Sequence, residues 1–395
     1  MIEVQRVAWF PETGPRKLAA DRQHMGTCKV YQFGGLKWAH RVARSVLVGC
    51  AALLLTMGVD GLELSPERFP ITVDGMTMEL PYSCSQPIDQ PDMRINRIIV
   101  AVHGRGPEAP AYLKRILEAG KQAPSQSRRT LVIAPQLLDD GNHTEMTLDD
   151  NDIYWTSGVS FWGGLSTGKQ ARRVSSFEIL DQLLASVSNR TLFPRLERIV
   201  IIGHSAGGQF VNRYAASSPF EDKVASPAGI SLRYIVCNPS TCVYFTPERV
   251  VPGTTTQFAV PDFSDCENYN HYGYGPEKLY SYHRENGGAL LRDSYASRNV
   301  IYMVGAEDND SRDSSLSNSC RAKMQGRTRL QRATIYFNYL KHVFGAEIAE
   351  RQTLVVVPGV GHSSGQIFKS KQGVAYLFDY PGDPMENRRL RENLE

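Results

Sequence analysis

The stretch that decides the fold is residues 198–208, which read Arg-Ile-Val-Ile-Ile-Gly-His-Ser-Ala-Gly-Gly. A β-branched run leads directly into the pattern Gly-x-Ser-x-Gly, and the helix-like spacing of Phe210 and Tyr214 follows. This order predicts a strand, a sharp turn and a helix, with the Ser205 hydroxyl exposed at the C-terminal edge of a sheet. Small residues on both sides of the serine suit such a crowded turn. The alternative is an ordinary glycine-rich connection between a strand and a helix.

Five further apolar runs predict that this strand belongs to a mostly parallel sheet. They are short and continuous, as expected for strands covered on both faces, and they alternate with stretches of helical spacing. This alternation predicts an α/β fold with helices on both faces of the central sheet. Residues 70–80, which contain Asp74-Gly75, alternate and predict an opening hairpin. The five runs are residues 97–102, 130–134, 233–237, 300–304 and 353–357, and the helical stretches are 112–117, 177–187, 327–344 and 364–378.

The composition fits a soluble globular protein and argues against nucleic acid as a partner. The chain has 395 residues, of which 42% are hydrophobic and 22% charged, which are ordinary fractions. The net charge of +3 is unevenly spread, because residues 1–44 carry eight Lys or Arg against three Asp or Glu. The remaining body is nearly neutral and has no basic stripe, so binding to nucleic acid is not expected.

An apolar segment near the N-terminus predicts an exported protein. Ser45–Val59 is uncharged and mostly apolar, and Lys37, Arg41 and Arg44 precede it. It is shorter than the ~20 residues that a spanning helix needs, and a basic flank before a short apolar core is typical of a signal peptide. We therefore expect a leader at residues 1–60 and a secreted or periplasmic location, with membrane contact only through an uncleaved leader. The alternative is a buried N-terminal helix.

The cysteines allow disulfides and do not suggest a metal site. Five of the seven follow the leader, so at least one thiol stays unpaired within the chain. We expect Cys242 to pair with Cys266, because both lie in an irregular stretch, and Cys237 to be a free thiol in a buried strand. No Cys or His spacing resembles a zinc site, so no metal is expected.

A long segment within the single folded domain of residues 61–395 predicts a lid. Residues 239–296 are rich in Pro, Gly, Asn and Tyr and show little periodicity. They are too long for a simple loop in a compact domain, so we expect a lid-like insertion over a pocket. The tyrosines of this insert favour an amphipathic binding wall or, alternatively, internal packing; they are Tyr244, Tyr269, Tyr272, Tyr274, Tyr280 and Tyr282.

Two tryptophans are candidate substrate-binding residues. Trp155 and Trp162 lie in the irregular stretch of residues 136–165. Large aromatic side chains often line apolar pockets. The equal alternative is that both anchor a long loop.

Polar residues follow several predicted strands and point to nucleophilic catalysis. Ser205, Asp308 and His362 each lie just beyond the end of a strand, where reactive groups of parallel sheets gather. A serine hydroxyl is a poor nucleophile unless a base takes its proton and a third group orients that base. His362 is the expected base, because it follows the last strand in a loop whose glycines allow the ring to approach the serine.

The orienting acid is expected between the serine and the histidine in sequence. Asp308 directly follows a strand and is our candidate, with Glu307 and Asp310 as neighbouring alternatives. One strand earlier, the corresponding position holds Asn238, which cannot carry the charge that stabilises an imidazolium. A solvated turn carboxylate is the alternative role for Asp308.

Two backbone N–H groups are expected to stabilise an oxyanion. Ala206 begins the helix after the serine, where the helix dipole also helps. The second donor should come from the loop after residues 97–102, with Arg105 as our candidate and Gly104 as the nearest rival. His103 is expected to support that loop, and His204 to pack beside its strand.

The order Ser205, Asp308, His362, with a His-Gly loop after an early strand, resembles the α/β-hydrolase superfamily. The resemblance covers about residues 70–380, and residues 193–209 resemble a group of bacterial and fungal hydrolases. It implies an α/β-hydrolase fold and hydrolysis of a small-molecule or lipid-like carboxylic ester through an acyl-enzyme, without metal or organic cofactor. A serine peptidase or amidase, an inert hydrolase-like binding protein and a cofactor-free perhydrolase are alternatives on the same fold.

Overall fold

The computed structural model describes residues 64–141, 148–167, 173–262, 264 and 266–380. The expected leader at residues 1–60 lies outside the described residues. Among the helices that the structure describes, none combines the length and the apolar character needed to cross a membrane.

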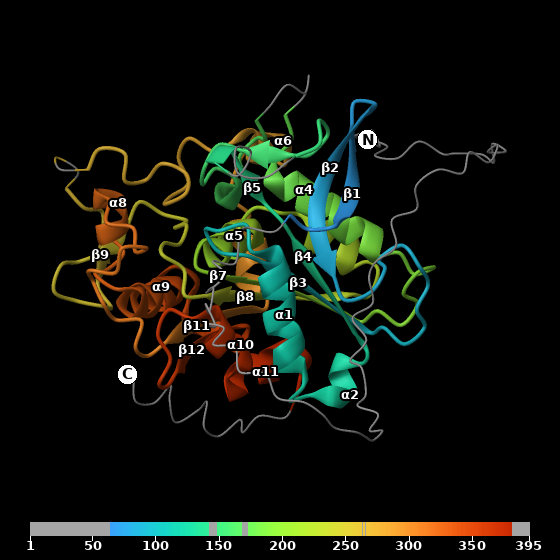
Figure 1. Ribbon diagram of the computed structural model, residues 1–395. Helices are drawn as coiled ribbons and strands as arrows, with labels where there is room; N and C mark the ends of the chain where they lie inside the picture. Colours follow the sequence, from blue (N-terminus) through green and yellow to red (C-terminus); the bar gives the residue numbers. More distant parts are fainter. Residues whose placement is uncertain (1–63, 142–147, 168–172, 263, 265, 381–395) are drawn as a thin grey trace, which may run out of the picture.

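An eight-stranded sheet forms the centre of the fold (Figure 1). Only the pairings of β1 with β2 and of β2 with β4 are antiparallel, and all later neighbours are parallel. The predicted mostly parallel sheet is therefore confirmed. The order across the sheet is β1 (Glu67–Val73), β2 (Met76–Cys84), β4 (Thr130–Pro135), β3 (Arg97–Val102), β7 (Arg198–His204), β8 (Ser231–Cys237), β11 (Val300–Gly305) and β12 (Gln352–Val357).

The central strands are buried on both faces because helices cover both sides of the sheet. Successive residues of β3 alternate between two hydrophobic clusters, with Ile98 and Val100 in one and Ile99 and Ala101 in the other. Each fully buried aliphatic side chain contributes about 1.5–3 kcal/mol. The first cluster includes residues of α4 (Ser176–Val187), α5 (Ala206–Ala215) and α9 (Arg329–Phe344), and the second includes residues of α1 (Ala109–Gly120), α10 (Ser364–Lys369) and α11 (Lys371–Phe378).

The chain reverses direction across the sheet between β3 and β7. It runs from β3 outward to β4 and then returns to the other side of β3 as β7. Parallel sheets bind ligands at such a switch point, outside the carboxyl ends of the strands. The loop after β3 and the turn after β7 meet there.

Local sequence explains the two ends of this sheet. The predicted hairpin is confirmed, since Asp74 and Gly75 join β1 to β2 with φ of 50° and 79°, as a tight hairpin turn requires. The helix expected over residues 364–378 is instead two helices. Ser370 ends α10 in extended backbone, and its Oγ accepts the Gly373 N–H at 2.9 Å to begin α11, which is ordinary N-cap chemistry.

Short elements fill the connections. They are α2 (Pro124–Ser127), β5 (Leu138–Asp139), β6 (Tyr154–Trp155), η1 (Ser160–Trp162), η2 (Glu221–Ala225), β9 (Arg249–Val250), β10 (Phe258–Ala259), α6 (Ser281–Glu285), α7 (Arg292–Ser297), α8 (Cys320–Lys323) and η3 (Ala346–Glu350).

The insert of residues 239–296 packs firmly against the body. The buried Arg213 guanidinium of α5 donates to the Gly273 carbonyl at 2.6 Å, and the Tyr339 hydroxyl of α9 accepts the Phe245 N–H at 2.8 Å. Of the six tyrosines named above, Tyr280 is half-buried and the other five are buried. Internal packing is therefore the main role of these side chains.

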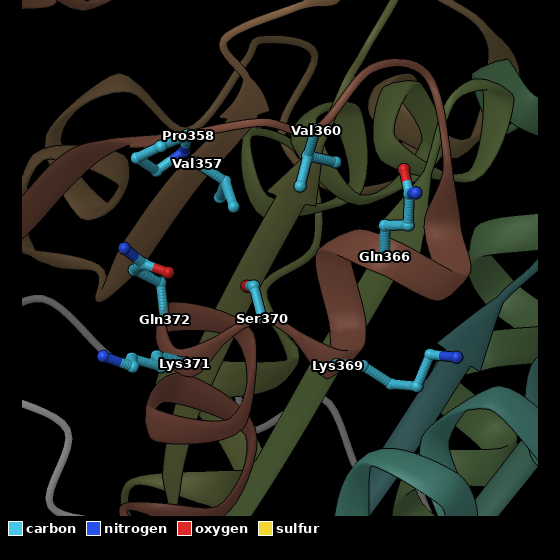
Figure 2. Close-up of a pocket in the computed structure, with 8 residues that line it drawn as sticks. All are labelled: Val357, Pro358, Val360, Gln366, Lys369, Ser370, Lys371 and Gln372. Carbon is cyan, nitrogen blue, oxygen red and sulfur yellow. The ribbon is translucent and has the colours of Figure 1, made fainter.

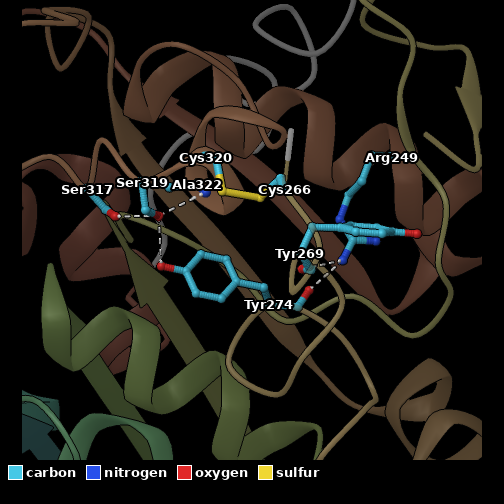
Figure 3. The surroundings of a disulfide bond; sticks show 8 residues. All are labelled: Arg249, Cys266, Tyr269, Tyr274, Ser317, Ser319, Cys320 and Ala322. Atoms are coloured by element: carbon cyan, nitrogen blue, oxygen red, sulfur yellow. Dashed lines mark hydrogen bonds between the residues drawn. A yellow bond between two sulfur atoms is a disulfide. The ribbon is translucent and has the colours of Figure 1, made fainter. Parts of the chain in front are cut away.

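One disulfide differs from the expected pairing. Cys266 of the insert joins Cys320 at the start of α8 (Figure 3), so the expected Cys242–Cys266 pair is wrong. Cys242 is buried, with its backbone N–H donated to the Gln325 side chain at 2.9 Å, and burial raises the pKa of its thiol to about 12. Cys237 is a buried free thiol, as expected. The expected pair was based on Cys242 and Cys266 sharing one irregular stretch, and that pattern does not show that Cys242 faces the core.

Candidate active site

Ser205 occupies the strained turn that the sequence predicted. Its φ of 59° and ψ of −116° lie outside the regions that L-residues prefer, which costs on the order of 1–3 kcal/mol. The turn is held where the Ser205 N–H donates to the Cys237 carbonyl of the neighbouring strand at 2.9 Å. Ala206 begins α5 directly afterwards. The strand, turn and helix are therefore confirmed, and the serine points out of the sheet edge.

Backbone contacts explain the glycines around the serine. A Cβ on Gly203 would lie 2.2 Å from the Gly207 carbonyl oxygen, and a Cβ on Gly207 would lie 2.2 Å from that of Val102. Both distances are far below van der Waals contact, and backbone cannot swing aside as a side chain can. The helix can start this close to β3 only because these positions carry no side chain.

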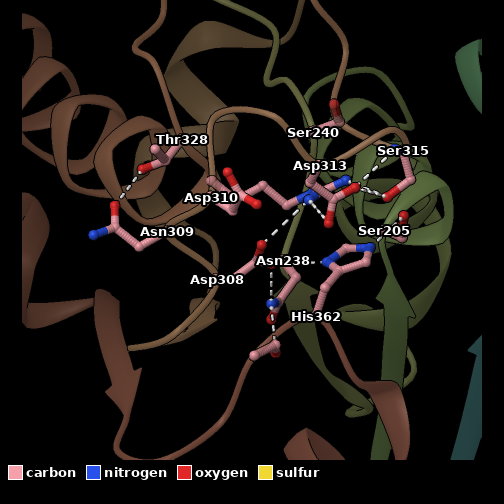
Figure 4. A network of polar contacts seen from close by, with 12 residues as sticks. Ser205, Asn238, Ser240, Asp308, Asn309, Asp310, Asp313, Ser315, Thr328 and His362 are labelled. Atoms are coloured by element: carbon pink, nitrogen blue, oxygen red, sulfur yellow. Dashed lines mark hydrogen bonds and ion pairs between the residues drawn. The ribbon is translucent and has the colours of Figure 1, made fainter.

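His362 lies between the serine and an acid. Its Nε2 is 3.0 Å from Ser205 Oγ, and its Nδ1 is 2.7 Å from Asp308 Oδ2 (Figure 4). An ionised carboxylate can only accept hydrogen bonds, so Nδ1 carries the proton. Nε2 of the neutral ring is then free to accept the serine proton.

Backbone contacts bring the histidine loop to the acid. The Glu307 N–H donates to the Val360 carbonyl at 2.9 Å. A Cβ on Gly305, the last residue of β11, would lie 2.1 Å from the same carbonyl oxygen. The loops that follow β11 and β12 therefore pack backbone against backbone, which places Asp308 and His362 side by side.

The structure distinguishes Asp308 from its neighbours in the loop of residues 306–319, which we call the acid loop. Asp308 is buried and contacts the imidazole. Glu307 is exposed and contacts the histidine loop through its backbone, and exposed Asp310 accepts the Arg312 N–H at 2.8 Å. Of the three carboxylates considered from the sequence, Asp308 is the one on His362.

Two further residues hold Asp308, and the sequence analysis assigned neither of them. The Asn238 side chain donates to Asp308 Oδ2 and, at 3.3 Å, to the Gly361 carbonyl. Arg329 Nη1 donates to Asp308 Oδ1 at 3.2 Å. The position of Asn238 directly after β8 could have indicated a supporting role. Arg329 is the first residue of α9, and its position in the sequence gave no such signal.

These contacts keep the acid charged. Burial, the largest single influence, raises the pKa of Asp308. The hydrogen bond from His362 and the charge of Arg329 together outweigh it, so the pKa lies below its ordinary value. Asp308 is therefore ionised at neutral pH, as an acid that orients a histidine must be.

The loop after β3 passes beside the serine. A Cβ on Gly104 would lie 3.8 Å from Ser205 Cβ. Buried His103 supports this loop as expected, because its Nε2 accepts the Leu137 N–H at 2.8 Å and its Nδ1 donates to the Gly104 carbonyl at 2.8 Å. Burial lowers the pKa of His103. Arg105 is the next residue of this loop, and its role as an oxyanion donor stays a prediction.

His204 packs beside its strand, as expected, and also against the site. It is buried, and its ring centroid lies 4.6 Å from that of His362. Burial, and then the neighbouring His362 and Arg329, hold the pKa of His204 well below its ordinary value. The ring is neutral and adds no positive charge next to His362.

The two tryptophans have different surroundings. Trp155 is 0% exposed, and its indole N–H donates to the Gly164 carbonyl at 3.1 Å. The expectation that it lines a pocket is corrected, because a fully buried anchor offers no surface to a ligand. Trp162 is half-buried and packs edge-on against Tyr274 of the insert, with the Arg213 guanidinium 5.4 Å from its ring. Its role in binding stays a prediction.

A pocket is lined by residues from the end of β12 to the start of α11 (Figure 2). None of the three residues Ser205, Asp308 and His362 lines it. Its lining residues are Val357, Pro358, Val360, Gln366, Lys369, Ser370, Lys371 and Gln372. In the part of the chain that the structure describes, no group of three or more His, Cys, Asp or Glu side chains is arranged to hold a metal ion.

The sheet order, the serine turn after β7, the acid after β11 and the histidine after β12 define an α/β-hydrolase fold. No protein-family model and no curated protein matches the chain.

Three solved structures with similarity to this chain are named as a depolymerase and two hydrolases. The poly(3-hydroxybutyrate) depolymerase LpqC of Bordetella parapertussis is 20% identical, with 82% of this chain and 94% of that chain covered and a TM-score of 0.48. Poly(aspartic acid) hydrolase-1 of Sphingomonas sp. KT-1 is 19% identical, with 81% and 100% covered and a TM-score of 0.49. The siderophore hydrolase EstB of Aspergillus nidulans is 14% identical, with 80% and 95% covered and a TM-score of 0.40.

Proposed function

We propose that this protein is a serine hydrolase that cleaves small-molecule or lipid-like carboxylic esters through an acyl-enzyme. The observation that carries the proposal is the continuous chain of hydrogen bonds from Ser205 Oγ through His362 to Asp308. Ser205 Oγ lies within proton-transfer reach of His362 Nε2, and Asp308 holds the other nitrogen of the ring. The nucleophile sits on a strained turn at the sheet edge.

The proposed reaction uses each group once in acylation and once in deacylation. Ser205 Oγ attacks the acyl carbon while His362 Nε2 takes its proton, and the proton then passes to the leaving alcohol. Water attacks the acyl-enzyme with His362 again as base, which releases the acid and restores the serine. Asp308 holds the ring and stabilises the imidazolium.

The oxyanion of each tetrahedral intermediate needs two preplaced donors. We assign this role to the N–H groups of Ala206 and Arg105. Ala206 stands at the first turn of α5, where the helix dipole favours negative charge. The loop that carries Arg105 is held beside Ser205 by the hydrogen bonds of His103.

Two further expectations belong to the proposal. The insert of residues 239–296 covers the substrate as a lid, with Trp162 at its boundary with the body. The protein is exported, and the Cys266–Cys320 disulfide favours this, because disulfides persist in oxidising compartments.

A turnover assay on the full chain tests the function. The substrates are p-nitrophenyl esters of short and long acyl chains and, for comparison, aminoacyl p-nitroanilides. We expect ester hydrolysis that Ser205→Ala lowers by about 10⁴-fold or more. The matched control Ser226→Ala, at an exposed serine on the surface, should stay within about twofold of the wild type.

The other outcomes each select a different function. Anilide cleavage that exceeds ester cleavage would identify an amidase or peptidase. Turnover that needs hydrogen peroxide and a carboxylic acid would identify a perhydrolase. If the wild type turns over none of these substrates, and the Ser205→Ala and Ser226→Ala variants are equally inactive, the protein is an inert member of this fold.

A further inference from the structure

A buried arginine stands directly behind the orienting acid. The Arg329 side chain is 0% exposed. Its Nη1 lies 3.2 Å from Asp308 Oδ1 and 3.3 Å from Asp313 Oδ2, and its Nη2 donates to Ser315 Oγ at 2.8 Å. One guanidinium therefore joins the orienting acid to a second carboxylate of the acid loop. Figure 4 shows Asp308, Asp313 and His362 within one network of polar contacts.

Arg329 and Asp313 have opposite electrostatic effects on the site. A guanidinium paired with Asp308 alone would cancel the negative charge that stabilises the imidazolium, because a buried cation acts strongly at this distance. The carboxylate of Asp313 balances that cation. With His362 neutral, the three charged groups sum to one negative charge, and protonation of His362 makes the whole cluster neutral.

Asp313 is held in an ionised state for this role. Both the backbone N–H and the hydroxyl of Ser315 donate to its Oδ1, at 2.7 Å and 2.6 Å. Burial, the largest single influence, raises the pKa of Asp313, but the Ser315 hydrogen bonds and the charges of Arg329 and His362 outweigh it, so the pKa is lowered. The carboxylate is therefore negative at neutral pH and lies within electrostatic reach of the imidazole.

The remaining charged and titratable groups around His362 come from the other packed elements. His204 of β7 packs against the ring at a tilt and is neutral. The charge of Arg115 of α1 also lowers the pKa of His204. Glu307 reaches the histidine loop through its backbone. None of these balances the Arg329 cation as the 3.3 Å contact with Asp313 does.

We propose that Arg329 and Asp313 are positioning residues of the hydrolase reaction. Arg329 fixes the Asp308 carboxylate so that Oδ2 meets His362, and Asp313 neutralises the guanidinium so that the charge of Asp308 remains available to the imidazolium. The inference deepens the proposed function and rests on it for its catalytic meaning. Neither residue touches the substrate in this account.

Opposite shifts in the titration of His362 test the inference. The imidazole is followed by NMR in the full chain with labelled histidine, and its signal is assigned through the His362→Gln variant. Asp313→Asn removes a negative charge and should lower the titration midpoint by about half a pH unit or more. Arg329→Gln removes a positive charge and should raise it by a similar amount, and Arg329→Lys should restore the wild-type midpoint.

The control is Asp310→Asn, an exposed acid of the same loop, which should leave the midpoint unchanged. In the ester assay, the acid limb of the kcat/KM profile should move with the NMR midpoint. We expect kcat to fall about tenfold in Asp313→Asn and further in Arg329→Gln. Because Arg329→Gln removes a buried charged group, the urea midpoint of this variant is measured as well. If Arg329→Gln proves to be unfolded, Asp313→Asn alone still tests the inference.

A merely structural role gives a different result. Shifts in the same direction for both charge removals, or a lowered kcat without any shift, would overturn the inference. An unchanged midpoint in folded Asp313→Asn would also overturn it. Absence of Ser205-dependent ester turnover in the wild type would overturn the proposed function, whereas the NMR midpoints decide the electrostatic roles separately.

Discussion

The serine turn and the acid loop reach the same site in different ways. The serine turn is built by consecutive residues, because β7, Gly203, Ser205 and Gly207 follow one another and their close contacts are mostly steric. The acid loop works only with groups from three other segments, among them Asn238 after β8 and Arg329 of α9. A nucleophile can therefore be recognised from a local pattern, whereas the environment of its acid is a tertiary property.

The serine turn and the acid loop should therefore be sensitive to different kinds of substitution. Added volume should damage the serine turn, since backbone surrounds it. A changed charge should damage the acid loop, since ion pairs and hydrogen bonds surround it.

The largest effect is expected from the charge of the acid. Asp308→Asn keeps the shape of the side chain but cannot stabilise the imidazolium or fix the Nδ1–H tautomer. We expect kcat to fall by about 10³–10⁴-fold. The free energy of unfolding should fall as well, because the variant leaves buried Arg329 without one of its two carboxylate partners. The matched change Asp310→Asn, two residues away and exposed, should alter kcat less than about twofold. Equal losses in both variants would contradict the assignment of the acid.

A single methyl group should disrupt the serine turn. Gly207→Ala places a Cβ 2.2 Å from the Val102 carbonyl oxygen, so β3 or α5 must move. We expect a loss of at least about 3 kcal/mol in the free energy of unfolding. The control is Gly365→Ala in α10, where a Cβ has no atom within 4 Å, and it should be neutral or stabilising by about 0.5–1 kcal/mol. Urea unfolding measures both, and a Gly207→Ala variant as stable as Gly365→Ala would refute the steric argument.

The difference between local contacts and tertiary contacts also decides which features the sequence could predict. The hairpin, the central strands and the serine turn depend on neighbouring residues, so their patterns were sufficient. The approach of His362 to Ser205 followed from parallel topology, because both come after strands of one sheet.

Features that depend on tertiary contacts could not be predicted in the same way. The partner of Cys266 was wrong, because the choice between Cys242 and Cys320 depends on which way each segment faces. Arg329 was missed, because a helical arginine has no local mark that distinguishes a buried partner of a carboxylate from a solvated side chain. The helix break at Ser370 was also missed, although a serine is a common cap.

Breaking the disulfide should change the region around the acid loop more than the serine turn. Cys266–Cys320 ties the insert to α8, directly after the acid loop, across 54 residues. Cys320→Ser should lower the free energy of unfolding by about 2–4 kcal/mol. Cys266→Ser should do the same, and the double variant should lose no more than either single variant. Additive losses in the urea midpoints would show that the two sulfurs do not act as one bond.

The smallest effect is expected from a charge cluster far from the chemistry. The Asp379 carboxylate, after α11, contacts Arg97, Arg198 and Arg233 at the starts of three neighbouring strands. Asp379→Asn should lower the free energy of unfolding by about 1–2 kcal/mol at neutral pH and leave kcat unchanged. This contrasts with Asp308, where loss of charge should change kcat as well as stability.

The pH dependence of that loss has a definite sign. Burial, the largest single influence, raises the pKa of Asp379, but the three arginines outweigh it and lower the pKa below its ordinary value of 3.8. A lowered carboxyl pKa adds stability that is fully present above the ordinary value and disappears as pH falls through the folded value. The difference between wild type and Asp379→Asn should therefore begin to shrink as pH falls below about 4 and should continue to shrink toward pH 2. A constant difference down to pH 2 in urea titrations would contradict this origin.

The central claim is that Ser205 is an activated nucleophile, and covalent labelling measures this most directly. The full chain is treated with a fluorophosphonate, and mass spectrometry of its peptides locates the adduct. The account predicts one adduct per chain, on Ser205, absent from Ser205→Ala and formed far more slowly in Asp308→Asn. A wild-type chain that gains no adduct, or an adduct on another residue that persists in Ser205→Ala, would contradict it.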